Sequence, residues 1–230
     1  MTRTAPPEWR VFTTSNELCE AVAHLIIETL QPRLKQGHRV HMVVPGGRSP
    51  QPIFKLLRSS VPDWSQIEIY PSDERALPRN HPERNDLMIR SLLQGEGGLP
   101  AANFHPIPAE LGAVAAAVAY HQLLQSRPPF DIALLGMGED GHTASLFPDN
   151  PALSDPAEAV AVFAAPKPPP ERVSLGLQRL QQARLTILLA TGAGKQTALQ
   201  QIRQGIPLPA AQVGADLCFC DQAAWGDDPV

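Results

Sequence analysis

Short apolar runs alternate with stretches of helical periodicity along the whole chain. Apolar runs bounded by turn-forming residues predict buried strands. We expect strands over 39–44, 66–71, 130–135, 159–164, 184–191 and 215–221, with a shorter one over 104–107. Between these runs, helices are predicted over 18–30, 50–60, 85–93, 110–124 and 194–203, with a further short helix capped by Ser174. Thr14 and Glu17 have the spacing of a capping box, and Gly37 is placed to end the first helix.

Strands that alternate with helices predict an α/β fold, with a mostly parallel sheet covered by helices on both faces. We expect one domain over residues 1–230, because the proline-rich patches 148–156 and 166–170 are short and flanked by apolar strands. Ligands of such sheets bind beyond the carboxyl ends of the strands. Four segments leave predicted strands there, at 45–50, 72–75, 136–142 and 191–195.

Composition excludes several classes of function. The 230 residues are 43% hydrophobic and 18% charged, as in globular proteins. The net charge of −4 provides no electrostatic attraction for nucleic acid or an anionic membrane. No apolar run approaches the roughly 20 residues that span a bilayer, and segment 1–12 lacks the apolar core of a signal peptide. The three cysteines fit free thiols in a reducing cytoplasm, with Cys218 and Cys220 on one face of a strand. We therefore expect a cytoplasmic protein that acts on a small molecule.

The segment 131–148, DIALLGMGEDGHTASLFP, holds several candidate functional residues close together. A predicted strand leads into G-x-G-x-x-G at 136–141, and His142 follows at once. A dinucleotide site would need this pattern in the first βαβ unit with a long helix after it, whereas here it lies past the midpoint and Pro148 allows only a short turn. The alternative is a rigid turn that presents Asp140 and His142. Histidine is the natural general base at neutral pH, and a nearby carboxylate fixes its tautomer.

Residues 45–50, Pro-Gly-Gly-Arg-Ser-Pro, join a predicted strand to a predicted helix. Gly46 and Gly47 allow a tight turn, and the helix N-terminus offers free N–H groups to an anion. Arg48 adds a cation and Ser49 a hydroxyl, although Ser49 could equally serve only as the helix N-cap. This loop is a candidate phosphate site.

Two further cations follow later strands. Lys195 stands in TGAGKQT, which fails the P-loop pattern because Leu189 and Gln196 occupy its first glycine and its hydroxyl position. Lys195 remains a candidate phosphate partner at a helix start, and the proline-stiffened loop 167–172 could hold Arg172 over a bound anion. Metal-ligand spacing is absent from the sequence.

Five segments, in order, resemble the 6-phosphogluconolactonase family, within a wider group that includes glucosamine-6-phosphate deaminase. They are Gly46-Gly47 with Ser49-Pro50, Asp73-Glu74-Arg75 with Pro78 and Asn85, Leu135 to Pro148, Lys167 to Leu175, and Gly192 to Lys195. The resemblance implies a modified Rossmann-like fold and hydrolysis of 6-phosphoglucono-δ-lactone without metal or organic cofactor, by a monomer or homodimer.

The resemblance also implies roles for individual residues. His142 would activate water, and Asp140 would orient His142 or the substrate. Asp73 would bind sugar hydroxyls or help position groups. The oxyanion would meet backbone N–H groups of the glycine turn or Arg75. The phosphate and sugar would be held by Gly46, Gly47, Arg48, Ser49, Gly138, Arg172 and Lys195.

The chain departs from the family's usual pattern at four positions, which are Pro45, Arg48, Ser49 and Arg84. A sugar-phosphate deaminase or isomerase is the main alternative function. Such chemistry needs further carboxylates around the histidine, and the nearest later acidic residue, Asp149, follows a proline. The deaminases also carry tyrosine where this chain has Arg75, which favours the lactonase. A non-catalytic sugar-phosphate sensor is a third interpretation, in which Asp140 and His142 would be idle.

Overall fold

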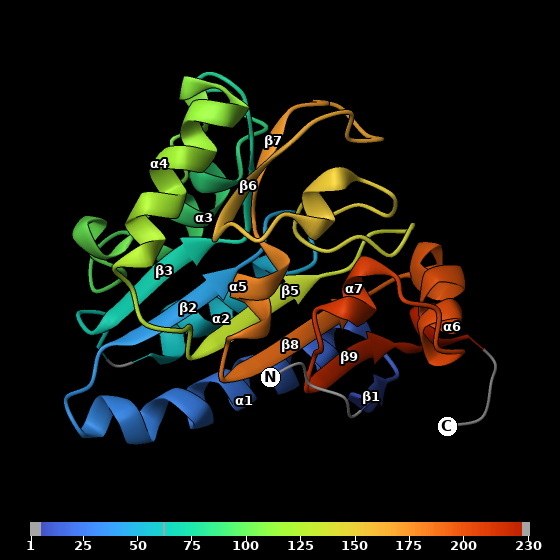
Figure 1. Cartoon of the computed structure of the whole chain (residues 1–230). Helices are drawn as coiled ribbons and strands as arrows, with labels where there is room; N and C mark the ends of the chain where they lie inside the picture. Colours follow the sequence, from blue (N-terminus) through green and yellow to red (C-terminus); the bar gives the residue numbers. More distant parts are fainter. Residues whose placement is uncertain (1–5, 62, 227–230) are drawn as a thin grey trace.

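The computed structural model describes residues 6–61 and 63–226, so residues 1–5 of the N-terminal segment lie outside it. A sheet of six parallel strands runs through the molecule in the order β1-β9-β8-β5-β2-β3 (Figure 1). Its strands are β1 (Glu8–Phe12), β2 (Val40–Val44), β3 (Ile67–Pro71), β5 (Ile132–Gly136), β8 (Leu185–Ala190) and β9 (Leu217–Asp221). The predicted parallel α/β architecture is confirmed.

Helices cover both faces of this sheet because successive strand residues point to opposite sides. Leu134 joins an apolar cluster with one group of helices, whereas its neighbour Leu135 joins a second cluster with the others. The first group is α1 (Ser15–Lys35), α2 (Gln51–Ser60) and α3 (Asn85–Leu93). The second is α4 (Ala113–Gln125), α5 (Leu177–Gln181), α6 (Gln196–Arg203), α7 (Pro209–Gln212) and α8 (Gln222–Trp225). Among the described residues, no helix combines the length and apolar character needed to cross a membrane.

A smaller antiparallel sheet lies with the second group of helices, and the sequence analysis missed two of its strands. It contains β4 (Asp73–Arg75), β7 (Arg172–Leu175) and β6 (Ala159–Val162) in that order. Segment 72–75 was expected to be a loop, because three residues carry too little periodicity to predict a strand. Ser174 was expected to cap a helix, but it lies inside β7, and α5 begins after Gly176.

The other predicted elements are largely confirmed. The capping box is present, with Glu17 N–H donating to Thr14 Oγ1 at 3.2 Å and Thr14 N–H donating to the Glu17 carboxylate at 3.0 Å. Cys218 and Cys220 are buried free thiols in the same apolar cluster.

The strand expected over 104–107 is reduced to a single bridge between Phe104 and Ile69. Strand β1 was not predicted, since it is short and polar-flanked and lies at the edge beside β9. The described residues also include four 3-10 helices, η1 (Ala101–Asn103), η2 (Ala109–Leu111), η3 (Pro151–Ser154) and η4 (Ala193–Lys195).

The connections of β2 and β5 determine where a ligand site forms. These strands are neighbours, but β2 leads into α2 on one face, whereas β5 leads through β6 and β7 to α5 on the other. Parallel α/β sheets bind ligands at such switch points, outside the carboxyl ends of the two strands. The loops 45–50 and 136–142 begin there.

Phe219 in the middle of β9 offers a test of the core. Its ring is fully buried and stacks on Phe12 with centroids 5.6 Å apart, whereas Phe163 is 49% exposed. We expect Phe219→Ala to lower the free energy of unfolding by about 3–5 kcal/mol, and Phe163→Ala to change it by about 0.5 kcal/mol or less. Urea unfolding of both variants measures the difference. Equal losses would show that Phe219 is not part of a packed core.

Candidate active site

All four segments predicted at the strand ends meet in one cavity of about 400 Å³. Its wall is formed by the loop after β2, strand β4, the glycine turn after β5 and the loop after β8, with Asn85, Lys167 and Arg172 added from other elements. This volume is within the range of small-molecule sites. Every predicted site residue lines the cavity except Asp140, which reaches it through His142.

His142 and Asp140 form a close polar pair at the site. The Nδ1 atom of His142 lies 2.5 Å from Oδ1 of Asp140, and the same oxygen accepts the His142 backbone N–H at 3.2 Å. Burial acts to raise the pKa of Asp140, but the hydrogen bond and charge of His142 outweigh it and lower the pKa to about 2. An ionised carboxylate only accepts hydrogen bonds. The proton of a neutral His142 therefore sits on Nδ1, and Nε2 keeps its lone pair.

Two neighbours hold the His142 ring in place. A Cβ added at Gly138 would lie 2.0 Å from His142 Nδ1 and 2.7 Å from Asp140 Oδ1, so only glycine leaves room for the pair. Phe147 packs against the imidazole with centroids 4.4 Å apart. The glycine at 138 is thus needed for close approach of the two catalytic candidates rather than for a nucleotide.

The backbone N–H groups of the glycine turn are mostly committed to the protein itself. Met137 donates to the Leu189 carbonyl at 3.0 Å, and Gly138 donates to the His142 carbonyl at 2.8 Å. Gly141 donates to the Gly138 carbonyl at 3.2 Å. An oxyanion hole built from these three amides would have to take one of them away from its acceptor. This favours Arg75 over the turn as the group that meets a developing oxyanion.

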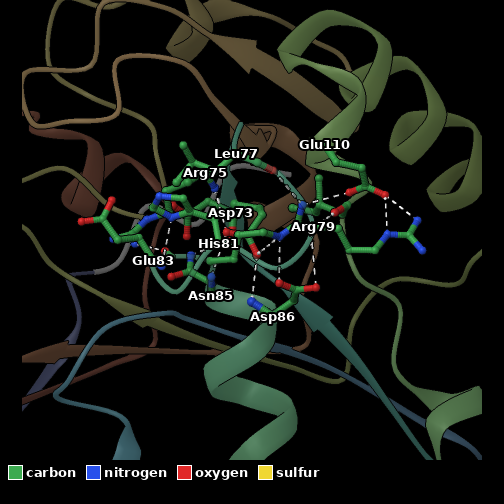
Figure 2. Close-up of polar contacts among 12 residues, drawn as sticks. Asp73, Arg75, Leu77, Arg79, His81, Glu83, Asn85, Asp86 and Glu110 are labelled. Atoms are coloured by element: carbon green, nitrogen blue, oxygen red, sulfur yellow. Dashed lines mark hydrogen bonds and ion pairs between the residues drawn. The ribbon is translucent and has the colours of Figure 1, made fainter.

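Strand β4 presents Asp73 and Arg75 to the cavity, because alternate residues of a strand share a face. Asp73 is buried, and its carboxylate accepts hydrogen bonds from Ser72 Oγ at 3.0 Å and Ser145 Oγ at 2.6 Å. Arg75 donates to the Glu83 carbonyl (Figure 2). Its buried Nε has no hydrogen-bond partner within the described part of the chain. The sequence analysis missed Ser145, for which position just after His142 was the only signal.

Arg172 enters the site from β7. It is buried, with Nη2 donating to the Lys167 carbonyl at 2.8 Å, and its guanidinium lies 5.5 Å from the centre of the Phe147 ring. Burial lowers the pKa of Arg172, while the charge of Asp73 acts in the opposite direction. The proline-rich loop therefore folds back over this arginine and fixes it at the cavity wall.

The loop after β2 is shaped by two side-chain contacts. Ser49 Oγ lies 2.7 Å from Thr191 Oγ1, which joins this loop to the one after β8. Ser49 is not a helix cap, since α2 begins after Pro50 without a side-chain cap bond. A Cβ at Gly46 would lie 2.0 Å from Asn85 Oδ1, so the Asn85 side chain packs directly against this glycine.

Charged groups gather at the rim beside Lys195. Lys167 Nζ lies 2.8 Å from Glu139 Oε2, and both side chains are exposed. Burial lowers the pKa of Lys195, while the negative charge of Glu139 acts to raise it. The sequence analysis gave neither Lys167 nor Glu139 a role, although both lie inside the motifs that it singled out.

The deaminase interpretation gains no support from Asp149, the nearest acidic residue after His142, because this residue does not line the cavity. Within residues 6–61 and 63–226, no group of three or more His, Cys, Asp or Glu side chains is arranged to hold a metal ion.

Comparisons with known proteins show the family of this chain. A family model described as glucosamine-6-phosphate isomerases/6-phosphogluconolactonase matches residues 13–224. A 6-phosphogluconolactonase from Mycobacterium leprae is 34% identical over 219 residues, covering 87% of this chain and 89% of that protein. A Homo sapiens 6-phosphogluconolactonase is 35% identical over 244 residues, covering 97% and 95%.

A solved structure gives the same result in three dimensions. The 6-phosphogluconolactonase from Thermotoga maritima superposes with a TM-score of 0.84 at 26% identity, covering 94% of this chain and 98% of that one. The family match, the two relatives and this structure all extend over most of the chain. The chain belongs to the glucosamine-6-phosphate isomerase/6-phosphogluconolactonase family.

Proposed function

We propose that this protein hydrolyses 6-phospho-D-glucono-1,5-lactone to 6-phospho-D-gluconate, the lactonase step of the oxidative pentose phosphate pathway. The observation that carries the proposal is the oriented His142–Asp140 pair beside a cavity that a glycine loop and several cations also line. The relatives named 6-phosphogluconolactonase share this chain over most of its length.

His142 acts as the general base. Its Nε2 lone pair takes a proton from water as the water oxygen bonds to the lactone carbonyl carbon. The tetrahedral intermediate then breaks its bond to the ring oxygen, which receives that proton from His142 and leaves as a hydroxyl. The carboxylic acid formed releases its own proton to solvent. Asp140 keeps the imidazole in the required tautomer and stabilises its protonated form.

Arg75 and Asp73 serve the sugar end of the substrate. Arg75 lines the cavity and offers a positive charge to the oxyanion of the tetrahedral intermediate. Asp73 is held by two hydroxyl donors and accepts hydrogen bonds from sugar hydroxyls. Neither role requires a metal or an organic cofactor.

The phosphate end combines a loop with side-chain cations. Gly46, Gly47, Arg48 and Ser49 present backbone and side-chain donors at the start of α2, while Lys195 and Arg172 approach from η4 and β7. Gly138 contributes at the sugar end by allowing the approach of His142. The ligand of this site is a small sugar phosphate, and the protein acts as a monomer or homodimer.

Replacement of His142 tests the general base. We expect His142→Ala to lower kcat by roughly 10²–10⁴-fold, because that is the usual contribution of a positioned general base. Acid release from 6-phosphogluconolactone made in situ, corrected for spontaneous hydrolysis, measures it. His24→Ala, which removes an exposed histidine of α1, should leave kcat unchanged. If the wild type does not exceed the spontaneous rate, the lactonase proposal is wrong; if His142→Ala retains the acceleration, only the general-base role is lost.

Replacement of Asp140 tests the tautomer argument. Asp140→Asn keeps the shape but can place an N–H group against Nδ1, which favours the tautomer with the proton on Nε2. We expect kcat to fall by roughly 10²-fold or more while KM changes little. Steady-state kinetics over a range of lactone concentrations below and above KM give both constants. A change confined to KM would mean that Asp140 contacts the substrate instead of orienting His142.

Replacement of Lys195 tests the phosphate end. Lys195→Ala should raise KM for 6-phosphogluconolactone by roughly tenfold, because a charge-assisted hydrogen bond to phosphate is lost, and should leave KM for unphosphorylated gluconolactone nearly unchanged. Lys35→Ala, which removes an exposed lysine of α1, is the matched control. Equal changes for both lactones would remove Lys195 from the phosphate site.

A further inference from the structure

Glu74 lies between Asp73 and Arg75 on β4 but takes no part in the cavity wall. Its side chain points to the opposite side of the strand, where it is completely buried. A buried carboxylate is expensive unless it is hydrogen-bonded or paired. Its partners therefore define what it does.

The Glu74 carboxylate accepts three backbone N–H groups, each at 2.8 Å. One oxygen takes those of Arg75 and Asn85, and the other takes that of Asp86. Asn85 and Asp86 are the first two residues of α3, whose N-cap residue makes no side-chain cap bond of its own. Glu74 thus caps this helix from another element.

Asn85 carries this constraint into the phosphate loop. Its Nδ2 donates to the Asp73 carbonyl at 2.9 Å, and its Oδ1 packs against Gly46. Since the Asn85 backbone is held by Glu74, the side chain stands as a spacer of fixed position between β4 and the loop after β2. The same carboxylate therefore contacts Arg75 directly and reaches Gly46 through one residue.

Arg84 lies next to the Glu74 carboxylate but makes no hydrogen bond to it. Its buried guanidinium uses all five N–H groups, donating to Asp86 and Glu110 carboxylates and to two carbonyl oxygens. Its Nε stays 3.9 Å from Glu74, so the hydrogen-bond partners of Glu74 are the three backbone amides. Arg84, where the chain departs from the family pattern, packs the outer side of the cap.

We propose that Glu74 is a positioning residue that fixes Arg75 and, through Asn85, the phosphate loop at Gly46 in one geometry. This inference rests on the proposed lactonase function. It assigns to the central residue of Asp73-Glu74-Arg75 a role distinct from those of its neighbours, which face the substrate. Positioning within about 1 Å matters, because larger displacements of binding groups weaken catalysis by orders of magnitude.

The variant Glu74→Gln tests the inference with almost no change of shape. Its amide oxygen can still accept from Arg75 and Asn85, but its NH₂ group would face the Asp86 N–H, donor against donor. We expect KM for 6-phosphogluconolactone to rise by roughly tenfold, since α3 and the phosphate loop shift. KM for unphosphorylated gluconolactone should change by less than about twofold, because that substrate does not use the loop.

The matched control is Glu110→Gln, at the outer end of the same network. Glu110 pairs with Arg84 at 2.9 Å and with Arg79 at 2.6 Å but contacts no N–H group of α3. It should lower thermal stability without changing the ratio of the two KM values. A ratio that stays constant in Glu74→Gln, or that changes equally in Glu110→Gln, would overturn the inference.

A second variant covers the case in which Glu74→Gln does not fold. Asn85→Ser keeps the N–H that Glu74 accepts but removes the amide that packs against Gly46, and the same selective rise in KM is expected. Failure of the function itself is recognised separately, by a wild-type rate equal to spontaneous hydrolysis. In that event, calorimetric titration with 6-phosphogluconate still tests the role of Glu74. Weaker binding by Glu74→Gln or Asn85→Ser than by Glu110→Gln supports the inference. Equal binding by these variants contradicts it.

Discussion

The site depends on the brief pairing of β2 with β5. Only Met42 and Val43 pair with Ile132 and Ala133, after which β2 continues beside β3 alone and β5 beside β8 alone. The two strands thus part at their carboxyl ends, where their connections already turn to opposite faces of the sheet. The loops that follow can fold away from each other and leave a cavity between them. His142 and the loop 45–50 both line this cavity because of that separation.

The sequence was sufficient to predict the parallel sheet and the position of the site. Strands such as β5 and β8 are buried on both faces and appear as unbroken apolar runs, and the loops after them carry glycine and charge. Strands β1, β4 and β7 escaped prediction because they are short and carry polar residues whose strand geometry comes from pairing with distant segments. Ser174 shows the problem directly, since its local context favours a cap and its register opposite Asp73 makes it part of a strand.

The same distinction separates the site residues that could be predicted from those that could not. His142 and Asp140 are two positions apart on a turn, so their contact follows from the local chain. Ser145 meets Asp73, and Glu74 meets the start of α3, only through the tertiary fold. The availability of backbone amides is harder still to predict. A glycine-rich turn suggests free N–H donors, whereas in the fold the N–H groups of Met137, Gly138 and Gly141 donate to carbonyl oxygens of the protein.

The ion pair between Glu139 and Lys167 places a counter-ion at the rim of the cavity. Glu139 also interacts electrostatically with Lys195, so one carboxylate offsets part of the charge of two lysines. An anionic group that binds at this rim would compete with one carboxylate rather than meet unpaired cations, and less side-chain freedom would be lost on binding. Added salt weakens the resident pair and the incoming one alike. Substrate affinity should therefore vary less with ionic strength than the number of nearby cations would suggest.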